Sequence, residues 1–177
     1  MIRIATENDI PAKLDIYRPY VENTTCSFEY DLPCTRSFTQ RFFEHTVQFP
    51  WLVWEEDGAV KGYAYAGAPW ERAAYRWSAE VSIYLAPEVQ RKGVGRALYA
   101  RLEDILKAQG YRMVYAVITS ENEASVAFHA ALGYRVAGEF HSCGFKQGRW
   151  LSVTWMEKEL AGEFIPGRFP KNWMECV

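Results

Sequence analysis

The sequence lacks the cysteine and histidine clusters that mark disulfide-rich or zinc-stabilised proteins. Its four cysteines stand at positions 26, 34, 143 and 176 without a C-x-x-C pair, and only three histidines are present. A disulfide framework is typical of small secreted domains, and a structural zinc site needs a full set of closely spaced ligands. We therefore expect a reduced chain that holds no metal.

Long apolar runs and an excess of one charge are missing too. No stretch approaches the ~18–20 apolar residues of a membrane helix. Arg3, Glu7 and Asp9 interrupt the region where a signal peptide has its apolar core. The formal net charge is −2, and lysine and arginine form no dense block. We therefore expect a cytoplasmic protein with neither a membrane nor a nucleic acid as partner.

What the chain does contain suits one compact domain. It has 177 residues, of which 49% are apolar, 24% charged and 16% aromatic. This length is enough to bury a substantial core. We place the domain at residues 1–160. The remaining tail, residues 161–177, carries Pro166, Gly167 and Pro170 and shows no helix or strand pattern.

The predicted elements mix hairpins with crossovers. Thr6, followed by acidic residues, is a good N-cap for a first long helix, and Asp57-Gly58 is a strong signal for a two-residue hairpin turn. Gly110 and Gly133 are suited to end two later helices. The mixture indicates an α/β fold whose mixed central sheet has helices on both faces. The predicted strands cover 2–5, 51–56, 60–68, 79–85, 112–118, 134–141 and 149–157, and the predicted helices cover 7–23, 36–49, 93–109 and 122–132.

The most informative segment runs from Gln90 to Arg96 and reads Q-R-K-G-V-G-R. It connects a predicted strand to a strongly amphipathic predicted helix. The first amides of a helix lack intrahelical partners and carry a partial positive charge. Glycines let a phosphate approach the backbone closely, and the basic side chains add positive charge. This arrangement suits a pyrophosphate.

Two other phosphate-binding motifs do not fit this segment. The Walker turn needs a lysine and then a serine or threonine after its last glycine, and the chain has Arg96 and Ala97 there. The dinucleotide fingerprint needs a third glycine where Leu98 stands.

The complete segment resembles the Q/R-x-x-G-x-G/A signature of the GNAT superfamily of acetyltransferases. A second segment, which starts N-E-A-S at Asn122 and ends L-G-Y at Tyr134, is similar to the family's N-x-x-S…L-G-F/Y pattern. Within the superfamily, residues 66–85 are similar to the phosphinothricin/methionine sulfoximine acetyltransferase group. The resemblance covers roughly residues 1–160 and implies the GNAT fold.

The resemblance implies an acetyl-CoA-dependent N-acetyltransferase whose substrate amine attacks the thioester directly. The amine would belong to a small amino-acid-like molecule such as phosphinothricin, methionine sulfoximine or methionine sulfone. The group is usually homodimeric. The residues implied to hold the coenzyme are Ile83, Tyr84 and Leu85 on the strand, Arg91, Lys92, Gly93, Val94, Gly95 and Arg96 in the turn, and Asn122 and Ser125 on the later helix.

Glu80 is the candidate general base. It stands on the polar face of the 79–85 strand. An amine substrate is mostly protonated at neutral pH and must lose a proton before it attacks. A carboxylate that acts directly or through one water contributes a factor of roughly 10²–10⁴. Taken alone, Glu80 also suits a solvated strand residue or an ion-pair partner, and the resemblance favours the base. The resemblance further gives the Leu85 N–H the stabilisation of the oxyanion.

His129 is the candidate general acid. Asn122, Ser125 and His129 share one side of a helix, so they form a polar stripe that we expect to face away from the core. Many GNAT enzymes have a tyrosine at the position of His129 that protonates the departing thiolate. A histidine titrates in a range that suits this role. A purely structural hydrogen bond is the alternative.

Four residues in two loops are candidates for contact with the substrate. Arg72 is suited to bind a substrate carboxylate or phosphinate in a fork, with Tyr75 beside it. Phe28 and Glu29 would form the opposite wall. The alternative for all four is an ordinary surface loop.

Other functions stay open at this point. A GNAT enzyme that acts on protein N-termini, polyamines or aminoglycosides is the nearest alternative, although Arg72 favours an anionic substrate. A coenzyme A-binding sensor without turnover and a structural module are the others.

Overall fold

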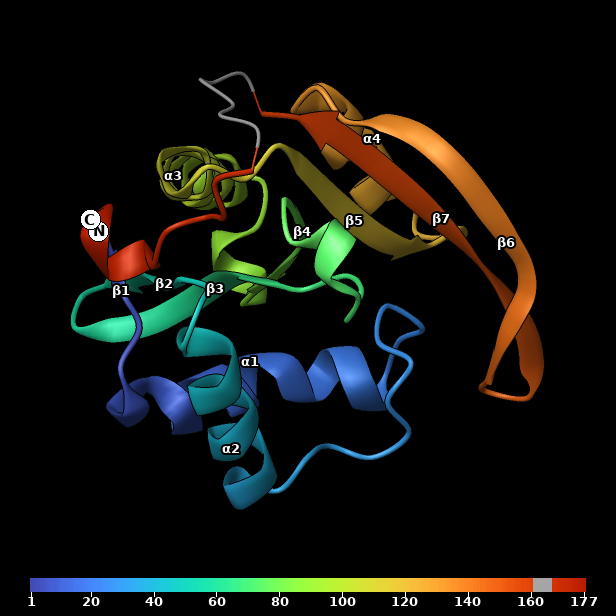
Figure 1. Cartoon of the computed structure of the whole chain (residues 1–177). Coiled ribbons are helices and arrows are strands. Elements are labelled where there is room, and N and C mark those ends of the chain that lie inside the picture. The colour runs from blue at the N-terminus through green and yellow to red at the C-terminus, as the bar shows by residue number, and fades with distance from the viewer. Residues whose placement is uncertain (161–166) are drawn as a thin grey trace.

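The computed structural model describes residues 1–160 and 167–177, and these form one layered α/β body around a seven-stranded sheet (Figure 1). The strand order is β1-β2-β3-β4-β5-β7-β6, antiparallel except for the pair β4 and β5. The mixed α/β fold predicted from the sequence is confirmed. The strands are β1 (Ile2–Ile4), β2 (Trp51–Glu56), β3 (Ala59–Gly67), β4 (Ser78–Leu85), β5 (Met113–Thr119), β6 (Arg135–Lys146) and β7 (Arg149–Glu159), and the α-helices are α1 (Ile10–Glu22), α2 (Thr35–Thr46), α3 (Val94–Gln109) and α4 (Glu123–Ala131).

The turns that bound these elements follow the local sequence signals. Asp57 and Gly58 both have positive φ, 51° and 75°, as the predicted two-residue hairpin requires. Gly110 ends α3 with φ 100°. The first helix opens with a short 3₁₀ turn, η1 (Glu7–Asp9), before α1 begins.

The β6–β7 hairpin is longer than predicted. Strand β6 continues to Lys146, beyond the expected end at His141, and its register with β7 shifts twice. The shifts fall between Val136 and Gly138 and between Phe140 and Gly144. A bulge reverses which face the following side chains occupy. The alternation therefore breaks inside one continuous strand, which is why the sequence pattern ended too early.

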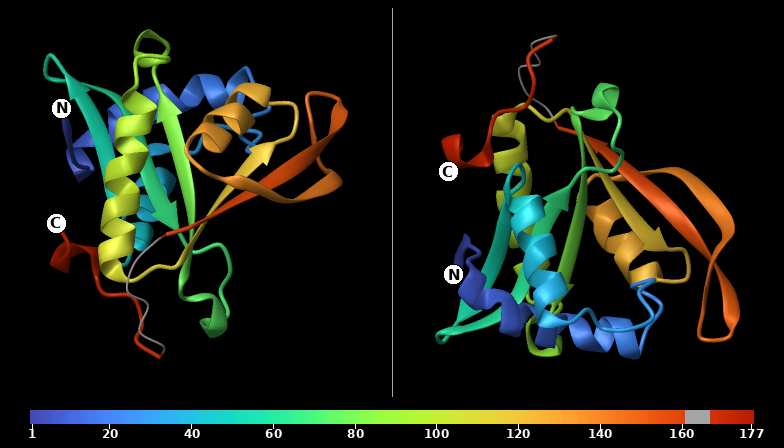
Figure 2. Two further views of the ribbon diagram at one scale, coloured as in Figure 1. Left: turned by 90° about the horizontal axis from the view of Figure 1, so that it is seen from above. Right: turned by 60° about the horizontal axis from the view of Figure 1, so that its bottom comes forward.

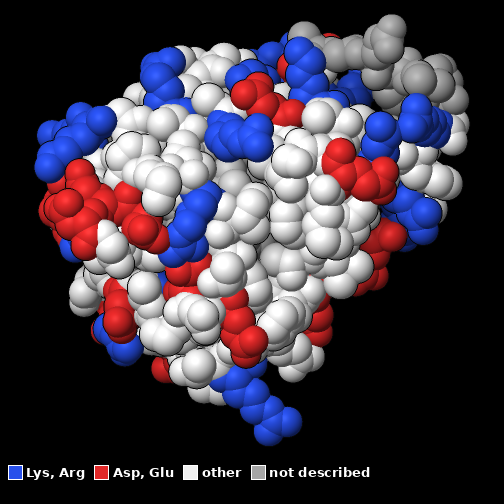
Figure 3. Space-filling model, turned by 90° about the vertical axis from the view of Figure 1, so that its left-hand side faces the viewer, with Lys and Arg blue, Asp and Glu red and all other residues white. Residues whose placement is uncertain are grey.

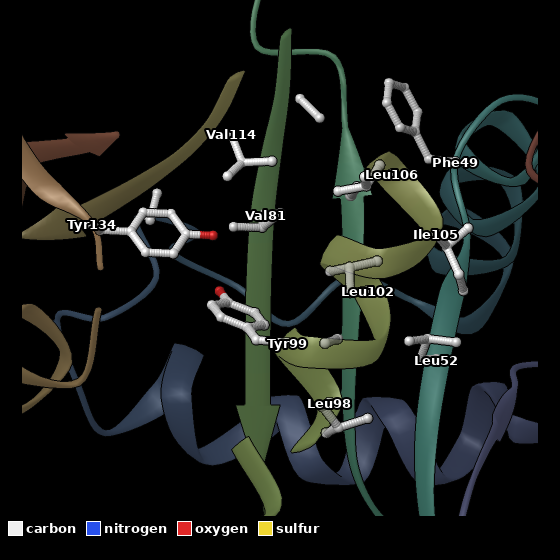
Figure 4. Packing of buried hydrophobic residues seen from close by; sticks show 14 of the residues in the cluster. Phe49, Leu52, Val81, Leu98, Tyr99, Leu102, Ile105, Leu106, Val114 and Tyr134 are labelled. Carbon is white, nitrogen blue, oxygen red and sulfur yellow. The ribbon is translucent and has the colours of Figure 1, made fainter. Parts of the chain in front are cut away.

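Helices cover both faces of the sheet (Figure 2). Helices α1 and α2 cover one face and bury an aromatic cluster that includes Phe38, Trp51 and Tyr63. Helix α3 covers the other face with the apolar stripe predicted for it. Figure 4 shows this stripe packed against Val81 of β4. The stripe residues Leu98, Leu102, Ile105 and Leu106 are all 0% exposed.

The end of the chain folds back onto the same subunit. The Gln109 side-chain amide donates to the Lys171 carbonyl at 2.8 Å, and the Trp173 indole donates to the Thr46 carbonyl at 2.8 Å. A short 3₁₀ helix, η4 (Trp173–Glu175), forms here, so the prediction of a tail without any element was wrong for these residues. Residues 161–166 of the predicted tail lie outside the described residues.

Strands β4 and β5 pair only at one end. Ser78, Ala79 and Glu80 of β4 lie opposite residues 113–115 of β5. Beyond this corner the two strands diverge (Figure 2), while β5 stays paired with β7 up to Thr119. The divergence leaves one edge of β4 without a neighbouring strand from Val81 onward.

Candidate active site

A cleft of about 360 Å³ lies in the gap between β4 and β5. Its walls are the open edges of both strands, with α1, α3 and α4 around them. The turn at the start of α3 reaches it through Gln90 and Arg91. The lining consists of Tyr20, Cys26, Val81, Ser82, Ile83, Tyr84, Leu85, Gln90, Arg91, Tyr99, Ala116, Val117, Ile118, Thr119, Asn122, Ala124, Ser125, Phe128 and His129.

The backbone of β4 offers hydrogen-bonding groups to this cleft at alternate residues. Gly62 of β3 lies opposite Leu85, and the Ala86 amide donates to the Lys61 carbonyl at 2.8 Å. This bond makes the Gly62–Leu85 pair a non-hydrogen-bonded one, so Leu85 turns its N–H and C=O away from β3 and toward the cleft. By the same alternation Ile83 does so too. Tyr84, which the resemblance included, turns its backbone toward β3 instead.

Tyr20 of α1 already engages Leu85 in this structure. Its hydroxyl donates to the Leu85 carbonyl at 2.6 Å and accepts from the Leu85 amide at 3.2 Å. The Gln90 side chain donates to the same hydroxyl at 3.2 Å. The amide predicted to stabilise the oxyanion is therefore bonded to a protein side chain. Sequence reasoning missed Tyr20, because this contact spans 65 residues and leaves no local pattern.

The turn before α3 forms the predicted cradle of unpaired amides. Arg91 and Gly93 have positive φ, 59° and 83°, which bends the chain so that successive amides converge. Within the described residues no hydrogen bond engages the amides of residues 91–96. The first bonded amide of the helix is that of Ala97, which donates to the Gly93 carbonyl at 3.0 Å. Such a cradle at a helix N-terminus suits an anionic group.

The two glycines of the turn serve different purposes. A Cβ built on Gly93 would meet nothing within 4 Å, so this glycine is needed for its positive φ. A Cβ built on Gly95 would lie 3.2 Å from the ring of Phe128 and 3.4 Å from the side chain of Ile83. Gly95 is buried. It therefore lets α3 pack closely against α4 rather than opening space for a phosphate.

Glu80 stands at the corner where the strands separate. It is the last residue of β4 that pairs with β5, opposite Tyr115, and it lies opposite Gly67 of β3. Burial raises the pKa of its carboxyl. Within the described residues this carboxylate forms no ion pair and no hydrogen bond. A half-buried carboxylate without a protein partner suits a base better than a structural ion pair.

Helix α4 places its polar stripe at and beneath the cleft wall. Asn122 caps the helix by accepting from the Ser125 amide at 3.1 Å, and its side-chain NH₂ donates to the Cys26 sulfur at 3.1 Å. All three residues of the stripe line the cleft, and His129 is only 3% exposed there. Its ring packs against Tyr99, and burial lowers the pKa of the imidazole.

The four predicted substrate contacts divide into two groups, and none lines the cleft. Phe28 lies against Gly144 near the tip of the β6–β7 hairpin, and Glu29 forms an ion pair with Arg41 of α2. Arg72 and Tyr75 are exposed at the short 3₁₀ helix η2 (Ala73–Tyr75).

Residues 2–155 match the family described as acetyltransferase (GNAT) domain. The chain belongs to the GNAT acetyltransferase family. It is 38% identical over 160 residues to a phosphinothricin N-acetyltransferase of Streptomyces viridochromogenes, which covers 90% of this chain and 87% of the relative. It is 35% identical over 167 residues to an L-methionine sulfoximine/L-methionine sulfone acetyltransferase of Salmonella typhimurium, with 93% and 97% covered.

A solved structure of a GNAT superfamily phosphinothricin acetyltransferase from Sinorhizobium meliloti, in complex with AcCoA, has the same fold. Its TM-score is 0.89 at 39% identity, and the match covers 97% of this chain and 92% of that chain. These findings confirm the resemblance to the phosphinothricin/methionine sulfoximine group that the motifs indicated.

Other classes of site find little support among the described residues. No group of three or more His, Cys, Asp or Glu side chains is arranged to hold a metal ion there. None of the helices in this part of the chain has the length and hydropathy needed to span a bilayer.

Proposed function

We propose that this GNAT enzyme transfers the acetyl group of acetyl-CoA to the primary amine of a small amino-acid-like molecule. Phosphinothricin, methionine sulfoximine and methionine sulfone are the representative substrates. Two features that lie next to each other carry the proposal. One is the edge of β4 that has no neighbouring strand, and the other is the set of unbonded amides in the turn between β4 and α3. The relatives that match most of the chain act on substrates of this class by name.

The described residues fit two parts of the coenzyme, its pyrophosphate and its amide-bearing pantetheine arm. The amides of residues 91–96, with the exposed side chains of Arg91, Lys92 and Arg96, suit the pyrophosphate. The outward N–H and C=O of Ile83 suit an amide-bearing arm that runs along the strand like an added strand. Asn122 and Ser125 face this arm from the opposite wall. The bound coenzyme supplies an activated acetyl thioester.

Glu80 accepts the proton of the substrate ammonium, directly or through one water. It is the last β4 residue that pairs with β5, so its backbone lies where the gap between the strands begins, although its side chain is not among those that line the cleft. Its raised pKa makes the carboxylate a stronger base than an exposed glutamate.

The proposed roles of Leu85 and His129 each depend on a tyrosine. The Leu85 amide donates to an incoming oxygen only after the hydroxyl of Tyr20 moves away from it. Nε2 of His129 lies 3.2 Å from the Tyr99 hydroxyl, so any proton passed toward the departing thiolate goes through the hydroxyl of Tyr99.

Thiol release from acetyl-CoA tests the function. We expect release with methionine sulfone, methionine sulfoximine and phosphinothricin, and much less with the polyamine spermidine. Faster turnover with spermidine would favour the polyamine alternative. Coenzyme binding without turnover of any amine would favour a sensor, and failure to bind coenzyme A at millimolar concentration would leave a structural module.

A homodimer is the expected assembly, and one aromatic surface supports it. The rings of Trp70 and Trp155 stack with centroids 5.5 Å apart, with Phe140 and Tyr75 beside them. Tyr75 and Phe140 are 42% and 56% exposed. An exposed apolar patch of this kind marks an interaction surface. Sedimentation equilibrium tests the assembly, and a monomer at micromolar concentration would contradict it.

The remaining expectations concern location and other partners. On the face shown in Figure 3, basic and acidic side chains lie side by side rather than in one basic patch. This mixture supports the proposal that no nucleic acid is a partner. The cytoplasmic location stays a prediction, which fractionation of the producing cells tests.

A further inference from the structure

A ring of hydrogen bonds joins α1 to the link between β4 and the amide cradle. The hydroxyl of Tyr20 on α1 donates to the Leu85 carbonyl at 2.6 Å, at the end of β4. The same hydroxyl accepts at 3.2 Å from the side-chain amide of Gln90, the residue directly before the cradle at 91–96. The Gln90 amide also donates to the Leu85 carbonyl at 3.2 Å. We call the Tyr20 hydroxyl, the Leu85 carbonyl and the Gln90 side-chain amide the Tyr20 network.

The Tyr20 network lies at the wall of the cleft and satisfies its own donors. All three of its residues line the cleft. Burial raises the pKa of the Tyr20 phenol, so the hydroxyl keeps its proton at neutral pH and donates it. The NH₂ group of Gln90 has two N–H donors, one for each of its two acceptors. Each donor of the network therefore has an acceptor inside it.

Tyr20 is itself fixed in place by contacts on other sides. The Thr24 hydroxyl donates to the Tyr20 carbonyl at 2.7 Å. The Lys146 ammonium, from the β6–β7 hairpin, donates to the Val21 carbonyl at 2.7 Å. The Tyr20 ring packs edge-on against Tyr84 of β4, with the ring centroids 5.1 Å apart. The end of α1 therefore provides a fixed point from which the Tyr20 hydroxyl reaches the start of the cradle.

The cradle depends on such a point, because its own amides contribute little to its shape. Arg91 and Gly93 hold positive φ values, and within the described residues no hydrogen bond engages the amides of residues 91–96. Near the start of the same turn, Lys61 forms an ion pair with Glu88, and such an exposed pair stabilises little. Donors that are held in their binding geometry bind a ligand more tightly than donors that must first be ordered.

We propose that Tyr20 is a positioning residue for the coenzyme, because it holds the cradle of residues 91–96, through Gln90 and the Leu85 carbonyl, in the shape that binds a pyrophosphate. An incoming oxygen at the Leu85 amide replaces only the longer bond of Tyr20, which is 3.2 Å, while the 2.6 Å donation to the carbonyl remains. This inference rests on the proposed function and adds to its coenzyme site a residue that lies outside the motif.

Calorimetry of two ligands tests the inference. Coenzyme A carries the pyrophosphate and the arm, whereas ADP carries the pyrophosphate without the arm and is measured by competition against coenzyme A. We expect Tyr20→Phe to raise Kd for both ligands about 3- to 10-fold, as for the loss of one intramolecular hydrogen bond. With acetyl-CoA saturating, kcat and the KM for L-methionine sulfone should stay within about twofold of the wild-type values, because only coenzyme binding is weakened.

A second variant tests whether Tyr20 acts through Gln90. Gln90→Met removes the other donor of the network at an exposed side chain, so the fold does not depend on it. We expect it to raise Kd for both ligands by a similar factor. In the double variant Tyr20→Phe/Gln90→Met the rise should be no larger than the larger of the two single effects, because residues of one network are coupled.

Tyr111→Phe is the matched control for the loss of a tyrosine hydroxyl. Tyr111 is buried, its hydroxyl accepts from the Gln48 side chain at 3.3 Å, and it does not line the cleft. We expect this variant to bind both ligands with the wild-type Kd. Thermal unfolding of Tyr20→Phe and Tyr111→Phe shows whether the two substitutions affect the stability of the fold to a similar extent.

Three results would overturn the inference. A rise in Kd for coenzyme A alone would mean that the Tyr20 hydroxyl acts on the arm and not on the cradle. An unchanged or lower Kd in Tyr20→Phe would mean that it does not support binding. Multiplying effects in the double variant would mean that Tyr20 and Gln90 act separately. If the wild-type enzyme bound neither ligand, the proposed function itself would fall, so the two failures are distinguishable.

Discussion

The hydroxyl of Tyr99 donates a hydrogen bond to Nε2 of His129 across 3.2 Å. The direction follows from the other ring nitrogen. Nδ1 lies 2.8 Å from the Ser125 carbonyl, which only accepts, so Nδ1 carries the proton of the neutral ring. Nε2 is then an acceptor, and its donor is Tyr99. In this state Nε2 of His129 carries no proton, the Nδ1 proton is held by the Ser125 carbonyl, and a proton passed toward the cleft starts on the Tyr99 hydroxyl.

Replacing Tyr99 by phenylalanine tests whether this pair takes part in the reaction. We expect Tyr99→Phe to lower kcat by at least about tenfold, toward the factor of 10² or more that a positioned proton donor contributes. KM for acetyl-CoA should change little. Tyr134→Phe is the control, because Tyr134 packs against the same imidazole at 5.3 Å but donates to Glu103 instead. Equal kcat values in the two variants would mean that the thiolate departs without this help.

Glu80→Gln tests the base. Because burial raises the pKa of Glu80 above its ordinary 4.5, the active carboxylate is lost as the pH falls through that raised value. We therefore expect an acidic limb in the pH profile of kcat that disappears in Glu80→Gln, together with a loss of roughly 10²–10⁴ in kcat at neutral pH. Glu88→Gln, at an exposed carboxylate paired with Lys61, is the control. If Glu80→Gln kept the wild-type kcat and the same acidic limb in its pH profile, Glu80 would have no part in the mechanism.

Gly93→Asp tests the amide cradle through coenzyme affinity. The substitution brings a negative charge to the proposed pyrophosphate site and strains a residue whose φ is +83°. Gly58→Asp carries nearly the same strain, with φ +75° and open space around it, in a hairpin turn away from the cleft. We expect calorimetry to show loss of coenzyme A binding in Gly93→Asp and normal binding in Gly58→Asp. Normal binding in both would contradict the assignment of the turn.

Lys13 makes the stability of the fold depend on pH. It is 0% exposed, its ammonium lies 3.7 Å from the ring centroid of Phe42, and burial lowers its pKa to about 7. Between that value and the ordinary 10.5 the unfolded chain binds a proton that the folded chain does not. The free energy of unfolding therefore rises with pH in this window, by up to about 1.4 kcal/mol per pH unit.

The variant Lys13→Met should lose this slope and be more stable than the wild type near pH 7. Chemical denaturation between pH 6 and 10 measures both effects, with Lys107→Met on the exposed side of α3 as the control. A slope that persists in Lys13→Met would assign it to other groups.

The sequence predicted most of the fold because the deciding signals are local. The turn at Asp57-Gly58, the end of α3 at Gly110 and the cradle before α3 each depend on residues that are neighbours in the chain. The β6 strand was cut short because its bulges interrupt the two-residue alternation, and no local rule restores it.

The site was predictable only where a motif or an alternation fixes the residue. Glu80 and the turn follow from such patterns. Tyr20 does not, since its contact with Leu85 depends on how α1 is placed over the sheet. The burial of His129 was missed for the same reason: helical spacing shows which residues share a side, but it does not show which side faces the neighbouring helix.

The corner at Glu80 and Tyr115 has a mechanical consequence. Among the described residues, three residue pairs of the sheet join the half built from β1–β4 to the half built from β5–β7, and contacts outside the sheet, such as that of Tyr99 on α3 with His129 on α4, hold the two halves together elsewhere. A ligand that lies along Ile83 and reaches Asn122 adds a bridge between the halves where the strands themselves do not pair. We therefore expect bound coenzyme to stabilise the placement of β4 relative to β5.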